Sequence, residues 1–182
     1  MPETMELAKV KAATAAEVCA RFNLKKEARQ LLRDGMGPGE FVHALVQNKQ
    51  YIAGIDFLAY ALPPREAIWW GCLCLQHASG GNLSMEDKAA CKAAVQWIMS
   101  PTEENRAAAE APAKAAGLGS QAGQLAMAAN QTGENIAPPN ASAKAVATAV
   151  KMASTNGDST KIGETQRSFV ELGIGVAEGR FR

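Results

Sequence analysis

The sequence has few aromatic residues, almost no excess of either charge, and no long apolar run. Aromatic residues make up 5% of the 182 residues, and 19 basic residues stand against 18 acidic ones, a net charge of +1. So small a net charge gives no broad attraction for nucleic acid or for an anionic membrane surface. The most apolar stretch, residues 67–75, is far shorter than the ~20 residues that span a bilayer. We therefore expect a soluble protein whose partner is neither nucleic acid nor a membrane.

Signals for export are also missing from the sequence. The first ten residues contain no basic region followed by an apolar segment, and no twin arginine occurs in the chain. Since a secretory signal needs such a pattern, the expected location is the cytoplasm. Cysteines in that compartment stay reduced, so we expect no disulfide.

Residues that bind metals are few and poorly spaced. Cys72 and Cys74 are two residues apart, which places them on different faces of a helix and misses the spacing of a redox or zinc pair. We interpret the thiols as small buried apolar side chains, and we predict neither a metal nor a cofactor. The full set consists of Cys19, Cys72, Cys74, Cys91, His43 and His77.

Catalytic patterns are equally weak. Cys74 and His77 are three residues apart and can share a helix face, but we interpret Cys74 as a core residue and His77 as a residue at the helix end, beside the negative end of the dipole. The acidic pairs at 86–87 and 103–104 fall in first turns of predicted helices, where the helix dipole already favours them. The glycine-rich segment 35–39 lacks the lysine of a phosphate-binding loop. We predict no catalytic residues and a protein that is not an enzyme.

Apolar residues recur at three- and four-residue spacing, and no segment alternates with period two. This pattern predicts an all-α fold, an irregular helical bundle of about nine helices, with stacked helix pairs as a variant. Residues 1–13 should be frayed or weakly ordered, and residues 14–182 should form one helical domain with an irregular loop near 132–141. Among the predicted helices are 25–34, 65–77, 84–99, 100–116 and 159–172.

Several helix boundaries follow from single residues. Thr14 and Ser84 each precede an acidic residue by three positions, which predicts an N-cap. Ser100 is predicted to cap the helix over 100–116, and Pro112 to kink or divide it. Gly173 is predicted to end the last helix. The helix over 65–77 is apolar almost all round, so we predict that it is the central and most buried one.

Trp69 and Trp70 are the most unusual pair in the chain. Adjacent residues on a helix point about 100° apart, so the two rings cannot both face one neighbour. Packing in the core accounts for such residues by default, whereas an exposed tryptophan marks an interface. Both are therefore candidate partner-binding residues.

Six segments together are similar to a known family: residues 15–22, 28–36, 61–74, 101–106, 115–119 and 169–179. They resemble an uncharacterised all-helical family of proteobacterial proteins of unknown function, encoded in type VI secretion gene clusters beside spike-tip and effector genes. The resemblance covers residues 14–179 and carries no catalytic or binding residues. It implies a genomic setting for the chain.

Three functions remain open at this point. The leading hypothesis is a non-enzymatic adaptor, chaperone or accessory protein that binds a secretion effector or a spike-tip component. The first alternative is an immunity protein that inhibits a cognate effector. The second is an enzyme with a cryptic active site, which a deep polar cavity containing His77 or a perturbed carboxylate would favour.

Overall fold

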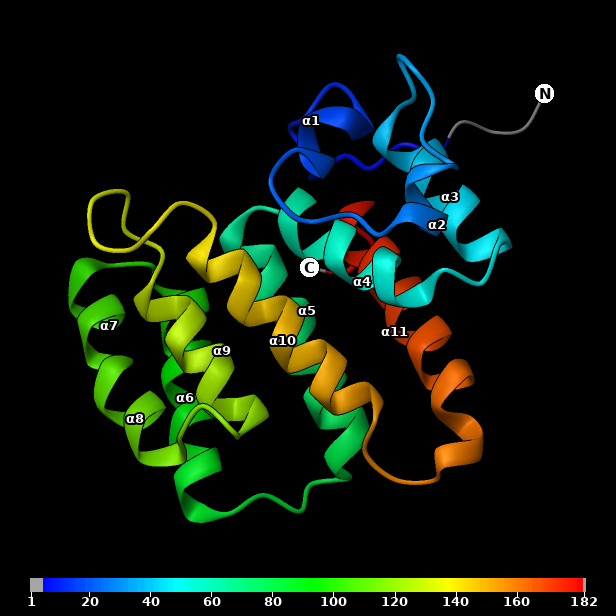
Figure 1. Cartoon of the computed structure of the whole chain (residues 1–182). Coiled ribbons are helices and arrows are strands. Elements are labelled where there is room, and N and C mark those ends of the chain that lie inside the picture. Colours follow the sequence, from blue (N-terminus) through cyan, green and yellow to red (C-terminus); the bar gives the residue numbers. More distant parts are fainter. Residues whose placement is uncertain (1–4, 182) are drawn as a thin grey trace.

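The structure, a computed structural model, describes residues 5–181. Within that range it has eleven α-helices, one 3-10 helix and no β-strand (Figure 1). The all-α prediction is therefore confirmed, and the count exceeds nine because four helices have only four to seven residues. The helices are α1 (Ala15–Cys19), α2 (Lys26–Arg29), α3 (Pro38–Gln47), α4 (Tyr51–Ala61), α5 (Pro64–Ser79), α6 (Met85–Met99), α7 (Glu103–Ala108), α8 (Glu110–Ala116), α9 (Gln121–Asn130), α10 (Ala141–Ser154), η1 (Ser159–Lys161) and α11 (Ile162–Ala177).

Helix α5 lies at the centre of the bundle. It contacts α4, α6, α9, α10 and α11, and Figure 1 shows α10 crossing it. Gly71 permits the close approach of α9 to α5, because a Cβ there would lie 2.4 Å from Leu125 Cδ2. The predicted central position is thus correct. The predicted rank in burial is not, because α4 buries seven of its 11 residues and α5 six of its 16.

Trp70 joins α5 to α11. Its side chain is fully buried, and its Nε1–H donates to the carbonyl oxygen of Phe169 at 2.9 Å. The ring lies against Gly173, where a Cβ would come within 2.8 Å of Trp70 Cε2. The prediction that Gly173 ends the last helix is therefore wrong. It lies inside α11, which continues to Ala177, and provides room for the indole.

Two of the three predicted N-caps, Thr14, Ser84 and Ser100, have the predicted role. Thr14 accepts from Glu17 N at 3.3 Å and Ser84 from Asp87 N at 3.0 Å, so both predicted caps are confirmed. The predicted cap Ser100 is wrong, because Thr102 caps α7 by accepting from Asn105 N at 3.2 Å. Ser100 instead ends α6, where its N–H donates to Gln96 O at 2.9 Å.

Two predicted helices are shorter than expected. The helix over 100–116 is divided at Ala109 and not at Pro112. Pro112 stands in the first turn of α8, where a backbone N–H has no helical partner to lose. The helix over 25–34 is reduced to the four residues of α2, of which only Ala28 is buried. So little packing does not offset the cost of nucleating a longer helix.

The segment expected to be frayed is packed where the structure describes it. Residues 5–13 are not helical, but Leu7 is buried and Lys9 N–H donates to Ala177 O at 2.8 Å. Tertiary contacts thus hold a segment without helical pattern. Residues 1–4 lie outside the described residues. The loop expected near 132–141 is irregular over 131–140.

In residues 5–181, none of the helices combines the length and the apolar character needed to cross a bilayer.

The contact between Trp70 and Gly173 can be tested with two alanine substitutions in α11. Gly173→Ala should lower the free energy of unfolding by roughly 1–3 kcal/mol, because the new Cβ overpacks the core against Trp70 and Leu58. Gly163→Ala is the matched control, because the described part of the chain places no side chain or other helix within 4 Å of its new Cβ. It should raise stability by about 0.4–1 kcal/mol. Urea unfolding measures both, and equal effects of the two substitutions would contradict the proposed close contact.

Candidate functional site

Four segments far apart in the sequence meet beside the first turns of α5. They are residues 5–13, the start of α5, the end of α6, and the end of α11 with the residues after it. Two backbone hydrogen bonds hold this junction: Lys9 N to Ala177 O at 2.8 Å, and Arg180 N to Gly175 O at 3.0 Å. Gly179, at φ +80°, turns the chain after α11, a conformation that glycine adopts without strain. The junction therefore has a defined geometry.

A groove of about 460 Å³ opens between these segments, and we call it the Trp69 groove. Five of its eight lining residues are apolar, so it is an apolar groove with a charged edge. Its lining consists of Lys9, Arg65, Glu66, Trp69, Ile98, Met99, Val176 and Phe181.

Exposed apolar side chains gather around this groove. Trp69 is half-buried, whereas Met99 is 73% exposed and Phe181 is 46% exposed. The Phe181 ring lies over Gly175, where a Cβ would come within 2.6 Å of its Cε2 atom. Single exposed apolar residues are ordinary, but a cluster of them around a concave surface is typical of a binding site.

The structure separates the two candidate tryptophans. Trp70 points into the core and binds Phe169, so no surface of it is open to a partner. Trp69 points to the groove. The sequence placed the two rings on different faces of one helix without showing which face was buried. Trp69 is thus the residue of the pair that a partner can reach.

Sequence reasoning missed Lys9, Met99 and Phe181. Lys9 and Phe181 lie in segments without a helical pattern, so only the tertiary structure brings them to Trp69. Met99 follows Val95 by one helical turn, and the structure places both on the face opposite Ala94 and Trp97. Apolar spacing alone assigns Val95 to the inner face of this helix, so the sequence does not mark Met99 as exposed.

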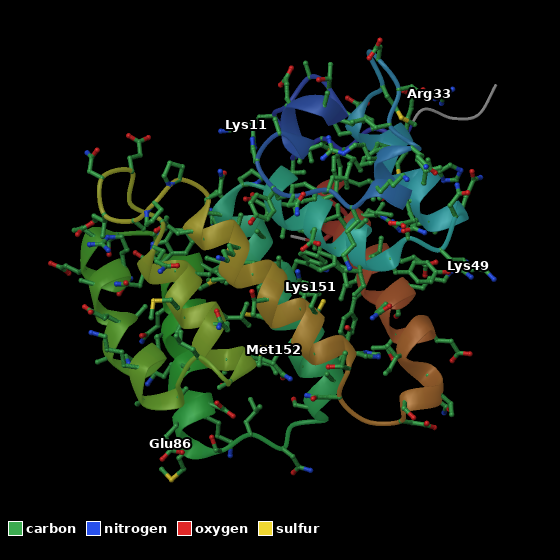
Figure 2. All side chains as sticks on the ribbon, viewed as in Figure 1. Lys11, Arg33, Lys49, Glu86, Lys151 and Met152 are labelled. Carbon is green, nitrogen blue, oxygen red and sulfur yellow. The ribbon has the colours of Figure 1, made fainter. Side chains whose placement is uncertain are left out.

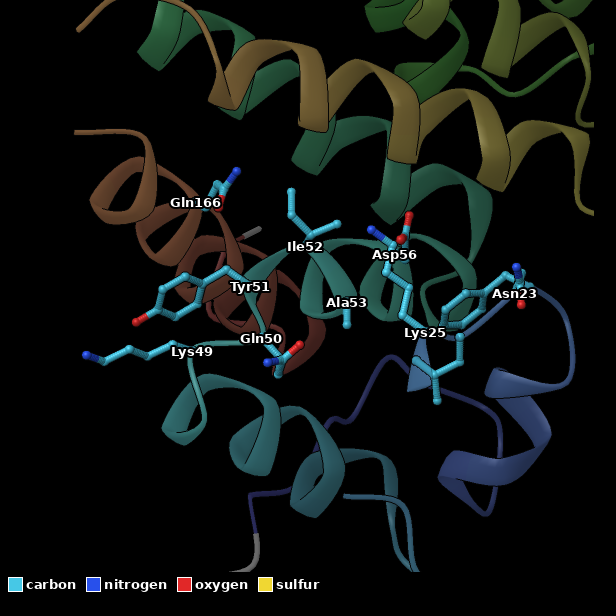
Figure 3. A pocket seen from close by; sticks show the side chains of 11 residues that line it. Asn23, Lys25, Lys49, Gln50, Tyr51, Ile52, Ala53, Asp56 and Gln166 are labelled. Carbon is cyan, nitrogen blue, oxygen red and sulfur yellow. The ribbon is translucent and has the colours of Figure 1, made fainter. Parts of the chain in front are cut away.

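A second, smaller cavity of about 170 Å³ lies between α4, the residues before α2, and Gln166 of α11. Figure 3 shows Asp56 on one wall with Lys25 reaching toward it, while Lys49 points away. Asp56 is already paired, because Lys151 Nζ lies 2.8 Å from its Oδ1. This cavity contains neither histidine of the chain.

The backbone beside this cavity is strained at one residue. Lys49 adopts φ +57°, in the left-handed region. It ends α3 with the hydrogen bonds of a Schellman motif, from Gln50 N to Leu45 O at 2.8 Å and from Lys49 N to Val46 O at 3.1 Å. Glycine is the usual residue at such a position. Figure 2 shows the Lys49 side chain at the outer edge of the molecule.

The cysteines are not prepared for nucleophilic chemistry. Burial raises the pKa of the Cys72 thiol to about 12, with a further contribution from Cys91. Burial likewise raises the pKa of Cys74 well above its ordinary value, and His77 packs edge-on against Phe169 with the ring centroids 5.9 Å apart. A reactive cysteine needs a lowered pKa, which these two thiols do not have. Of the four thiols predicted to be buried, Cys19 and Cys74 are buried, whereas Cys72 and Cys91 are only partly buried.

The acidic pairs have structural contacts. Glu103 forms an ion pair with Arg106, and the hydrogen bond from Arg106 holds the pKa of Glu103 below its ordinary value. The Asp87 carboxylate accepts a hydrogen bond from Ser120 Oγ, and the backbone N–H of Asp87 donates to Oγ of the N-cap residue Ser84. General acid catalysis requires a carboxyl with a raised pKa, the opposite of what Glu103 shows.

Metal binding has no assembled ligand set in the part of the chain that the structure describes: no three His, Cys, Asp or Glu side chains converge there.

The fold and the groove define a class of protein: an all-helical bundle with an apolar groove at the junction of four chain segments. The chain belongs to a family of unknown function, DUF6931, whose model matches residues 41–177. That match includes Trp69, Met99 and Val176, whereas Lys9 and Phe181 lie outside it. The comparisons with curated proteins and with solved structures give no match.

The strain at Lys49 can be measured. Lys49→Gly should raise the free energy of unfolding by about 1 kcal/mol, because glycine adopts the left-handed conformation without a Cβ clash. Asn140→Gly serves as the control, since Asn140 has φ +64° and asparagine tolerates that region. Urea unfolding should show a gain at position 49 and almost none at 140. A loss at position 49 would mean that the lysine side chain stabilises the fold.

The raised thiol pKa values predict alkaline sensitivity. Thiols in the unfolded chain ionise near their ordinary pKa of 9.0, whereas the pKa of Cys72 in the fold is about 12. The stability due to the protonated thiol is therefore complete below pH 9.0 and is lost as the pH rises toward 12. The free energy of unfolding should fall over this interval, and Cys72→Ala should make the fall shallower. An unchanged slope would contradict this assignment.

Proposed function

We propose that this protein is a non-enzymatic adaptor, chaperone or accessory protein that binds another protein through the Trp69 groove. The observation that carries the proposal is the concave cluster of Trp69, Met99 and Phe181, whose apolar side chains remain open to solvent. Covering such a surface removes apolar area from water, the main favourable contribution to protein association. Tryptophan in a partly buried position is also the residue type most enriched in binding hot spots.

The groove suits a segment of a partner protein rather than a flat surface. Its floor is formed by Trp69, Ile98 and Val176, and its rim carries exposed Met99 and Phe181. An amphipathic helix docks in this way by placing its apolar side chains into a groove. Methionine adapts its shape to such side chains because it is unbranched and polarisable. The occupant we propose is therefore an amphipathic segment of another protein.

The family that the sequence resembles supports a more specific partner. That family is encoded beside type VI secretion spike-tip and effector genes, so the partner we propose is an effector or a spike-tip component. Loading such a component requires a protein that binds it, and the exposed apolar side chains of the Trp69 groove provide a surface for binding.

Two substitutions to lysine test the groove. Met99→Lys should leave the melting transition nearly unchanged, because the side chain is 73% exposed. It should weaken binding by about 30-fold, the loss of roughly 2 kcal/mol expected of a hot spot. Leu118→Lys is the matched control, since Leu118 is 63% exposed and lies outside the groove. The measurement is co-purification with each protein encoded in the same gene cluster.

Two outcomes would contradict the proposal. One is equal capture of a cluster-encoded protein by Met99→Lys and Leu118→Lys. The other is that no cluster-encoded protein binds the native chain. Trp69→Ala adds a second check, because it should reduce capture while Trp70→Ala, which empties a core position, should lower stability by about 3–5 kcal/mol.

A further inference from the structure

One face of α6 is exposed to solvent within the described residues 5–181. Met85, Lys88, Lys92, Val95 and Met99 follow the three- and four-residue spacing that places them on one stripe of a helix. Ala89 and Gln96 lie on the same side, and all seven residues are exposed. We call these seven residues the outer face of α6.

The outer face contrasts with the opposite side of the helix. Ala90, Ala94 and Trp97 are buried, and α6 packs against α8 and α9. On the outer face, Met85 is 83% exposed, Val95 is 37% exposed and Met99 is 73% exposed. Two opposite stripes, one buried and one with exposed apolar residues, are the pattern of a helix that packs on both sides once a partner is bound.

The outer face leads into the Trp69 groove. Met99 is its last residue and also lines the groove. At a rise of 1.5 Å per residue, the distance from Met85 to Met99 is about 21 Å, the length of a partner helix of about four turns. The two surfaces therefore form one continuous strip.

The charges on this strip are of one sign, with a single exception. Lys88 and Lys92 lie on the outer face, and Lys9 and Arg65 border the groove. Within residues 5–181, none of these four cations takes part in an ion pair. The exception is Glu66.

The acidic residues of α6 itself lie off the outer face. Glu86 is one position past Met85 and so points about 100° away from it, and Figure 2 shows it at the far end of the helix. Asp87 accepts a hydrogen bond from Ser120 Oγ. The strip therefore presents apolar side chains between unpaired cations.

We propose that this strip binds an acidic amphipathic helix of a partner protein. Its apolar side chains would lie along Met85, Val95 and Met99 and enter the groove at Trp69, and its carboxylates would face Lys88 and Lys92. The inference rests on the proposed protein-binding function and adds the chemistry of the partner. Complementary charge gives such a pairing its register and its rate of association.

Other occupants fit the strip less well. A second copy would place Lys88 and Lys92 against the same lysines, because the surfaces of a symmetric dimer are identical. An anionic membrane is flat and does not fill a groove of 460 Å³. Nucleic acid binding depends on phosphate neutralisation, which exposed methionines do not provide, and the net charge of the chain is only +1.

The test uses a synthetic peptide of about 16 residues with leucine at heptad positions a and d and glutamate at e and g. A fluorescent label reports binding by anisotropy. The control peptide has lysine in place of every glutamate. The acidic peptide should bind the native chain, the basic one should not, and binding should weaken as salt rises from roughly 50 to 300 mM.

Charge reversal in the protein provides the second arm. Lys88→Glu with Lys92→Glu should weaken binding of the acidic peptide by about tenfold or more. Lys25→Glu with Lys26→Glu, which makes the same change of charge on exposed lysines away from the strip, should have little effect. Circular dichroism verifies that both variants fold, and the salt dependence of the native chain tests the inference without any variant.

The outcome of each experiment either supports the acidic-helix inference or overturns it. Equal or tighter binding of the basic peptide, or no effect specific to Lys88 and Lys92, would overturn the inference. So would dimerisation through this face in sedimentation, or binding to anionic vesicles without binding to the peptide. If the peptide fails while a cluster-encoded protein binds in a Met99-dependent manner, the acidic-helix inference fails and the proposed function stands. If that capture also fails, both fall.

Discussion

The position of the Trp70 indole ring determines how α5 packs against α11. Trp70 needs a partner for its N–H and a flat surface for its ring, and α11 supplies both through the carbonyl of Phe169 and the missing side chain of Gly173. This contact sets the distance and rotation of α5 against α11. Because Trp69 is the preceding residue of α5, the same rotation turns it out of the core, toward the ends of α6 and α11. The groove is thus a consequence of how its neighbour is buried.

Small residues make the rest of the bundle possible. A chain with so few aromatic residues cannot fill wide gaps between helices, so its helices must approach closely. Gly71 allows α5 and α9 to approach closely. Gly54 allows the same between α4 and α11, where a Cβ would lie 3.1 Å from Val170 Cγ2. Buried alanines such as Ala94 and Ala149 serve the same purpose. Close packing of backbones therefore replaces the bulk of large side chains.

How much was predictable depended on the range of the interaction. The fold class, the caps at Thr14 and Ser84 and the central position of α5 follow from local spacing and cap chemistry, and all three are confirmed. The end of α11 was wrong because Gly173 serves a contact with a residue about a hundred positions away, which no local pattern contains. Likewise Trp69 was identifiable as a candidate, but its neighbours Lys9 and Phe181 come from segments without periodicity. Local rules predict elements, while the site arises where distant elements meet.

The outer face of α6 shows why exposed residues carry the argument for function. Ala90, Ala94 and Trp97 pack the inner face of the helix against the bundle. The stability of the fold therefore does not depend on Met85 or Met99. Long flexible side chains are least restricted when they stay in water, and ordering them costs side-chain entropy. A partner that orders them must compensate by removing apolar area from water and by pairing the lysines between them. An acidic amphipathic helix does both at once, whereas an uncharged one would leave Lys88 and Lys92 to lose water without gaining a carboxylate.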